Sequence, residues 1–225
     1  MRVGQEYSTE YKLDGNMLHR VQEENDLGIT VTSDLKPSVQ CSKAVAKAAM
    51  QVLGVIKRNF VLNDVEDFRL LFNGFVRPHL EYCVHVWSPY LRKDIDSIEK
   101  VQRRATKLVK GLKNKSYEER LQALGITSLE KRRIRGDLIQ VFRIVRSFDR
   151  IKVDELFEFD DGGGHVLRGH NWKLKVKRCR LQVRKCFFTQ RIINVWNKLP
   201  EYVVESSSVV MFKKRLDDWS KDVEL

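Results

Sequence analysis

Residues 94–110 have the sequence DIDSIEKVQRRATKLVK, in which two helical patterns overlap. The first is an apolar stripe at steps of three and four residues, formed by Ile95, Ile98, Val101, Ala105 and Leu108. The second is a row of cations at similar steps, formed by Lys100, Arg103, Arg104, Lys107 and Lys110. This spacing predicts an amphipathic helix that packs its stripe on a core and presents the cations on another face.

The row of cations has two interpretations. A line of positive charge along one helix is suited to contact with the phosphate backbone of a nucleic acid. The alternative is a solvated helix whose charge only serves solubility. Acidic residues are sparse on this helix after Glu99, which favours backbone contact. A similar cluster, with Arg132 and Arg135, lies at the start of a later predicted helix.

Helical periodicity extends outward from this segment over most of the chain. We predict further helices over residues 38–60, from Asn63 to Pro78, up to Trp87, and over 116–125, 128–148, 187–199 and 208–219. Asn63 is predicted to cap its helix, and Pro78 is expected to break or kink it. The fold class is therefore mainly α, with a helical bundle at its centre.

Strand-like alternation is confined to two places. Near the N-terminus, YSTEYKL and MLHRV flank the turn sequence Asp14-Gly15-Asn16 and predict a small β-hairpin, and LGITVTS, residues 27–33, predicts a third strand. Near the C-terminus, residues 172–185, WKLKVKRCRLQVRK, alternate weakly and predict a short basic β segment. We expect three parts: residues 1–35 with the strands, 36–150 as the helical domain, and 151–225 as a basic region with two helices.

The composition indicates a polyanionic partner. The chain has 225 residues, 42% of them hydrophobic and 32% charged, which excludes wholesale disorder, and its net charge is +12. Residues 162–200 contain no Asp or Glu, and a block of one sign suggests a binding surface. Lys175, Lys177, Arg178 and Arg180 are its candidate nucleic-acid contacts. A nuclear localisation signal is the alternative interpretation of this block.

The sequence has no signal peptide and no apolar run that could cross a bilayer. We therefore expect a protein of the nucleus or cytoplasm, neither secreted nor held in a membrane. The four cysteines, Cys41, Cys83, Cys179 and Cys186, are interpreted as reduced thiols.

Two groups of residues have the chemistry of a metal site but not its spacing. His79, Cys83 and His85 lie in RPHLEYCVHVWSPY, residues 77–90, and no second pair of ligands accompanies them. If this stretch is helical, His79 and Cys83 share a face. The preferred interpretation is a packed corner in which Leu80, Cys83, Val84 and Trp87 point inward. A second group, His165, His170, Cys179 and Cys186, matches neither a zinc finger nor a zinc knuckle. We predict no cofactor.

The order of several motifs resembles a known family. FVRPHLEYCVHVWSPYLRKDIDSIEKVQRRATKLVKGL is the most specific of them, and NDLGITVTSDLKPSVQCSKAVAKA, IKRNF, SYEERLQALGITSLEKRRIRGDLIQVFRIV and FFTQRIINVWNKLPEYVV accompany it in order. Together they resemble the C-terminal part of reverse transcriptases of non-LTR (LINE-type) retrotransposons, of the chicken-repeat and jockey branch. The resemblance extends over nearly the whole chain.

This resemblance implies a fold and a function. Residues 1 to about 32 would match the last strands of the polymerase palm, residues 37 to about 147 the thumb, and the remainder the C-terminal region of these RNA-directed DNA polymerases. In the family order, the metal-binding aspartates of the palm precede this segment. The resemblance therefore implies a non-catalytic, truncated part that binds RNA or an RNA–DNA hybrid with low specificity. The missing palm and fingers are a further expected partner. The alternatives are a product without selected activity, and a part of a longer active enzyme.

Overall fold

The computed structural model describes residues 11–19, 21–162 and 169–222. It is mainly helical, as predicted, and it divides into two compact units, Met1–Ile126 and Thr127–Leu225. This division differs from the expected boundaries at residues 35 and 150. The long helix after residue 128 packs with helices near the C-terminus, so it belongs to the second unit.

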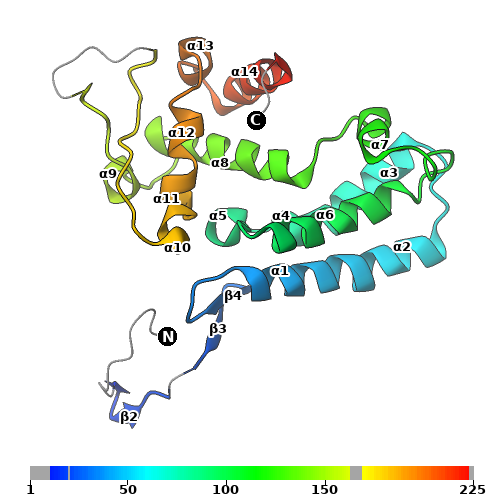
Figure 1. Cartoon of the computed structure of the whole chain (residues 1–225), viewed down its shortest axis with the longest axis horizontal. Coiled ribbons are helices and arrows are strands. Elements are labelled where there is room, and N and C mark those ends of the chain that lie inside the picture. The colour runs from blue at the N-terminus through cyan, green and yellow to red at the C-terminus, as the bar shows by residue number, and fades with distance from the viewer. Residues whose placement is uncertain (1–10, 20, 163–168, 223–225) are drawn as a thin grey trace. The chain divides into compact units, whose positions relative to one another are not determined.

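The first unit begins with two β-hairpins and continues with helices (Figure 1). Its strands are β1 (Lys12–Leu13), β2 (Asn16–Met17), β3 (Glu23–Asp26) and β4 (Ile29–Thr32). Its helical segments are α1 (Ser38–Val45), η1 (Ala46–Val52), α2 (Leu53–Asn59), α3 (Val65–Leu71), η2 (Phe72–Val76), α4 (Arg77–Glu81), α5 (Val84–Trp87), α6 (Arg92–Thr106) and α7 (Tyr117–Leu124). The segments η1 and η2 are π-helical.

Both hairpins are antiparallel and close through two-residue turns with positive φ. Asp14 and Gly15 have φ of 49° and 79°, and Leu27 and Gly28 have φ of 47° and 82°. Glycine adopts such angles without steric cost, so its second place in each turn fits the hairpin geometry. The predicted hairpin is confirmed for Lys12–Leu13 and Asn16–Met17, whereas residues 18, 19 and 21 of the predicted second strand are not in a strand. The strand predicted within 27–33 is confirmed as β4. Strand β3 was not predicted, because its residues EEND have low strand propensity. Residues 7–10 of the predicted first strand lie outside the described residues.

The helix predicted to begin at Asn63 is capped one residue later. The Oδ1 atom of Asp64 accepts the backbone N–H of Asp67 at 2.9 Å. The backbone N–H of Asn63 donates instead to Oδ2 of Asp67, at 3.0 Å. The carboxylates of Asp64 and Asp67 therefore both accept backbone N–H groups at the start of α3.

Of the two expected effects of Pro78, a break or a kink, the break is wrong, because the helix passes through this proline and ends at Glu81. The π-helical η2 directly precedes it, and the backbone N–H of Arg77 bonds to the carbonyl of Phe72, five residues back. A wider π turn accommodates a residue that lacks an N–H. The interruption falls at Tyr82, with ψ of 121°, and Cys83, with φ of 52°.

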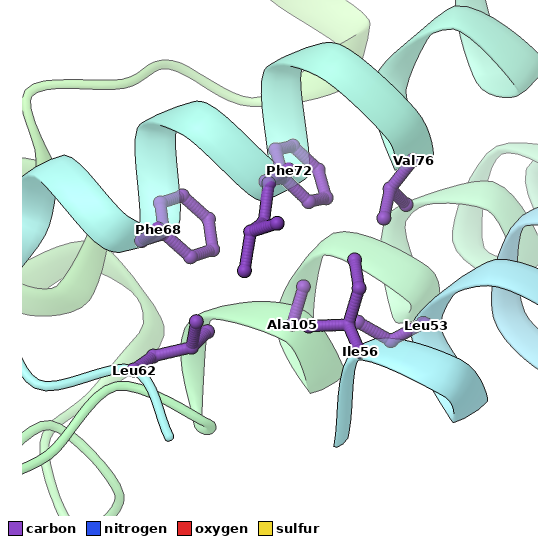
Figure 2. Close-up of a pocket in the computed structure, with 8 residues that line it drawn as sticks. Leu53, Ile56, Leu62, Phe68, Phe72, Val76 and Ala105 are labelled. Atoms are coloured by element: carbon purple, nitrogen blue, oxygen red, sulfur yellow. The ribbon is translucent and has the colours of Figure 1, made fainter. Parts of the chain in front are cut away.

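The core of the first unit forms between α2, α3, η2 and α6. Phe68 and Phe72 stack with ring centroids 5.0 Å apart, and α6 contributes Ile98, Val101 and Ala105, all buried. Figure 2 shows Leu62, on the loop after α2, with Phe68 and Phe72 across the space from it. The predicted packing of the α6 stripe is thus confirmed for its three central residues.

The second unit consists of helices around one aromatic core. They are α8 (Leu129–Val145), α9 (Val153–Leu156), α10 (Gln182–Lys185), α11 (Phe188–Arg191), α12 (Ile193–Trp196), α13 (Glu201–Val204) and α14 (Val209–Asp222). Phe142 of α8 stacks on Phe212 of α14 at 4.1 Å, next to the fully buried Trp196. Across this core, Arg191 forms two hydrogen bonds with the buried carboxylate of Asp137, at 2.8 and 3.0 Å.

The predicted basic β segment near the C-terminus is only a single bridge. Leu174 pairs antiparallel with Phe159, and residues 182–185 form helix α10 instead of a strand. Trp172 packs partly buried against the core and Leu174 is buried, whereas Val176 and Leu181 are exposed, so the apolar alternation does not continue beyond Leu174.

Candidate nucleic-acid interface

The predicted cations of α6 lie on the exposed side of a helix whose other side is buried. Lys100, Arg103, Arg104, Lys107 and Lys110 are all exposed. Helix α6 ends at Thr106, four residues before the predicted end. Lys110 nevertheless has a fixed backbone, because its N–H donates to the carbonyl of Leu62 at 2.9 Å.

The row is not neutralised by carboxylates. Among the residues that the structure describes, no acidic side chain forms an ion pair with Lys100, Arg104, Lys107 or Lys110. Glu99 lies within one turn of these cations, but its side chain is buried and accepts a short hydrogen bond from the hydroxyl of Tyr117. Because Glu99 is directed inward and Asp96, one turn before Lys100, pairs with Arg92, no ion pair within α6 offsets the charge of the row.

The same buried hydrogen bonds orient one of the cations. The guanidinium of Arg103 lies 4.4 Å from the ring centroid of Tyr117, within the range of a cation–π contact. Gln102 donates from Nε2 to the Tyr117 hydroxyl at 2.9 Å. Burial, together with the hydrogen bond to Glu99, raises the pKa of Tyr117, so its hydroxyl stays protonated and donates to Glu99. The ring under Arg103 is therefore held in place.

Two cations of this surface were missed by the sequence analysis. Lys113 and Lys115 follow α6 in the loop before α7, and both are exposed. The backbone carbonyl of Lys115 accepts a hydrogen bond from the buried guanidinium of Arg120. The Lys-rich sequence KGLKNK, residues 110–115, was the available signal. We define the α6 cationic surface by its seven residues Lys100, Arg103, Arg104, Lys107, Lys110, Lys113 and Lys115.

The predicted contacts in the second unit are more strongly compensated. Arg135 binds the carboxylate of Asp217 through Nε and one NH2 group, at 2.5 and 2.8 Å. Glu158 pairs with both Lys175 and Lys177, at 2.7 and 3.3 Å. Asp217 lies 82 residues from Arg135 and Glu158 lies 17 residues from Lys175, so local spacing could not predict these partners.

The other predicted cations of this unit differ in exposure. Arg178 and Arg180 are exposed, whereas Arg132 is half-buried and engaged with other groups.

The structure does not bring the residues of the first candidate metal group, His79, Cys83 and His85, together as one helical face would. Because the helix is interrupted at Tyr82 and Cys83, His79 and Cys83 do not share one helical face. Leu80, Val84 and Trp87 are buried as predicted, but Cys83 is exposed, because its left-handed backbone turns it away from the corner. Trp87 anchors the corner by donating from Nε1 to the carbonyl of Tyr82 at 2.6 Å.

In the second candidate metal group, both ring nitrogens of His170 contact backbone groups. His170 is fully buried; its Nδ1 accepts the N–H of Trp172 at 3.1 Å, and its Nε2 lies 3.2 Å from the carbonyl of Trp196. Cys179 and Cys186 are half-buried, and His165 lies outside the described residues. Within the described part of the chain, no three His, Cys, Asp or Glu side chains are grouped so that they could hold a metal ion.

The core of the first unit contains a cavity that does not suit a ligand. Its volume is about 10 Å³, and only apolar side chains line it, among them Leu62, Phe68, Phe72 and Ala105 (Figure 2). A cavity of this size holds at most one water molecule, and a water needs polar partners that this lining lacks. The space is best described as a small packing defect beside α6.

Comparisons with protein families, with curated proteins and with solved structures find no match to this chain. No helix in the described ranges combines the length and the hydrophobicity that a membrane crossing requires.

Proposed function

We propose that this chain binds RNA, or an RNA–DNA hybrid, through phosphate contacts of the α6 cationic surface. The observation that carries the proposal is a line of exposed cations in which the adjacent carboxylate of Glu99 is directed into the core. Positive charge without a compensating partner attracts a polyanion and releases its counterions. The contacts involve phosphates rather than base edges, so we expect low sequence specificity.

The resemblance to the C-terminal part of non-LTR reverse transcriptases supports the same ligand. In that family the catalytic aspartates belong to the palm, and the segment resembled here follows them. We therefore propose that the chain contributes binding and not polymerisation. Primer extension by the purified chain, with template and deoxynucleotides present, would contradict this part of the proposal.

Charge reversal tests the binding proposal directly. Arg104→Glu combined with Lys107→Glu reverses two exposed cations of the α6 cationic surface. The control, Lys213→Glu with Lys214→Glu, makes the same change in charge on exposed positions of α14. We expect the first variant to weaken RNA binding by at least tenfold and the control to change it by less than about threefold. Equal effects of the two variants would show that the attraction depends only on net charge.

A second candidate function is favoured by the N-terminal hairpins. Residues 11–19 are exposed throughout, and they include the large apolar side chains of Leu13, Met17 and Leu18. Apolar side chains displayed on a two-stranded hairpin are typical of a surface that another protein segment covers. We propose, as the alternative, that the chain acts as part of a longer reverse transcriptase. Co-purification with separately expressed palm and fingers, lost in Leu13→Lys with Met17→Lys, would support it.

A further inference from the structure

An exposed aromatic ring lies at the end of helix α2, among cations. Phe60 follows α2 directly in an extended conformation, and its side chain is 52% exposed. Lys57 and Arg58 precede it in the last turn of the helix, and both are exposed. Among the described residues, neither of these two cations has a carboxylate partner. The segment thus combines an open π surface with free positive charge.

The backbone on both sides of Phe60 is fixed. Its own N–H donates to the carbonyl of Ile56 at 2.9 Å, which completes the last turn of α2. Two residues later, Leu62 is 4% exposed and points into the core cavity with Phe68 and Phe72 (Figure 2). Because Leu62 is anchored, the ring of Phe60 is displayed from a rigid base and not from a mobile loop.

The same anchor brings Phe60 to the α6 cationic surface. Leu62 pairs with Val109 in a parallel bridge, and its carbonyl accepts the N–H of Lys110 at 2.9 Å. Two residues of extended chain span at most about 7 Å. Phe60 therefore lies close to the end of the row that Lys107 and Lys110 occupy, with Lys57 and Arg58 on its other side in sequence.

We infer that the ligand of this surface is a single-stranded nucleic acid, with one base stacked on the ring of Phe60. This inference rests on the proposed function and specifies its ligand. Flanking phosphates would bind Lys57 and Arg58 on one side, and Lys107 and Lys110 on the other. Aromatic rings beside a cationic groove bind single strands in this way, because every base has a π face. A duplex keeps its bases stacked internally, so Phe60 gains nothing from it.

Charge favours a nucleic acid over a protein as the occupant. An apolar protein partner would gain from Phe60 and Val61 but not from the cations around them. The acids nearest in sequence are Asp64, Glu66 and Asp67. Asp64 and Asp67 are engaged as caps at the start of α3, and Glu66 pairs with Arg69 at 3.0 Å.

The test compares a single strand with a duplex. We would measure fluorescence anisotropy with an RNA of about ten uridines, with a duplex of equal phosphate number, and with a base-free oligomer of the same backbone. Phe60→Ala should weaken binding of the single strand by about tenfold and leave binding of the duplex and the base-free oligomer within about twofold. Phe60→Trp should retain the affinity, and uridine binding should quench its added indole emission.

Control variants distinguish a failure of the stacking inference from a failure of the proposed RNA binding. Phe75→Ala removes another exposed ring, 56% exposed on η2, and should leave all three affinities unchanged. Phe60→Leu keeps an apolar side chain without a π face and should behave like Phe60→Ala. If Phe60→Ala affects all three ligands equally, or none of them, the stacking inference is wrong. If instead it abolishes self-association and leaves RNA binding intact, Phe60 contacts protein, and the inference is equally wrong. Failure of the proposed function appears separately, as unchanged binding in the Arg104→Glu with Lys107→Glu variant.

Discussion

The guanidinium of Arg103 lies over the ring of Tyr117 at 4.4 Å, and the hydroxyl of that ring is hydrogen-bonded to the buried Glu99. The buried side chain of Tyr117 therefore contacts two charged groups. Its hydroxyl donates to the Glu99 carboxylate inside the unit, and its ring positions the Arg103 guanidinium at the surface. The α6 cationic surface depends on this inward network as much as on its own residues.

This relationship predicts coupling between two residues in RNA binding. Tyr117→Leu removes the ring below Arg103 and should weaken binding about as much as Arg103→Ala, whereas the double variant should be no weaker than either. Arg104 contacts no aromatic ring in the described part of the chain, so the effects of Arg104→Ala and Tyr117→Leu should add. A double-mutant cycle from anisotropy data measures the coupling. Additive losses for Tyr117 and Arg103 would contradict a positioning role of the ring.

Tyr117→Phe separates the ring from the hydroxyl. It leaves the buried Glu99 carboxylate without this donor, which should lower the free energy of unfolding by about 1–3 kcal/mol. RNA affinity should remain within about twofold at a temperature where both proteins are folded, because the ring below Arg103 is kept. Urea denaturation and anisotropy on the same samples check both statements. An affinity loss that matches Tyr117→Leu would assign the effect to the hydroxyl.

Two ion pairs of the second unit should differ strongly in their contribution to stability. Arg191→Met leaves the buried Asp137 carboxylate without its main partner and should cost about 3 kcal/mol. Arg135→Met, the matched control, breaks a pair with Asp217 that is partly exposed, and should cost less than about 1 kcal/mol. Chemical denaturation measures both. Similar costs would mean that the Asp137 pair is not buried as described.

The second unit should lose stability in mild acid through His170. Burial lowers the pKa of His170, and the neighbouring Lys173 acts in the same direction. The hydrogen bond to the carbonyl of Trp196, and the charges of Glu201 and Glu205, oppose this shift. The unfolded chain, with a histidine pKa near 6.5, then takes up the proton first as the pH falls. The stabilising contribution is therefore complete above about pH 6.5 and decreases below it.

His170→Gln should flatten this pH dependence, because glutamine does not titrate there. Tryptophan fluorescence follows the transition, since Trp172 and Trp196 both contact His170. An unchanged slope in the variant would exclude His170 as its source.

The anchor of the Phe60 segment can be tested by stability alone. Leu62→Ala enlarges the core cavity and should cost about 3 kcal/mol, whereas Val61→Ala, at a position 76% exposed, should change stability by less than about 0.5 kcal/mol. Thermal and urea denaturation give the two values. If Val61→Ala is the more costly change, the described register of this segment is wrong.

Helical periodicity predicted the features that depend only on the residues of a single helix. The opposed apolar stripe and cation row of α6 follow from local spacing, and the structure has them. The π-helical turn before Pro78 and the left-handed Cys83 do not follow, because they depend on packing between segments. The pairing of Arg135 with Asp217 was also unpredictable, because it joins residues 82 positions apart. The approach of the segment after α2 to Lys110 was unpredictable for the same reason, since it depends on the bridge between Leu62 and Val109.

The most direct test of the central claim is the salt dependence of RNA binding by the unaltered chain. Between about 50 and 200 mM salt, contacts with four to seven phosphates should give a log–log slope between about −3 and −6. Reversal of Arg104 and Lys107 should make the slope shallower by about 1 to 2. An affinity that does not change with salt, or no binding at the lowest salt, would contradict electrostatic recognition of the phosphate backbone.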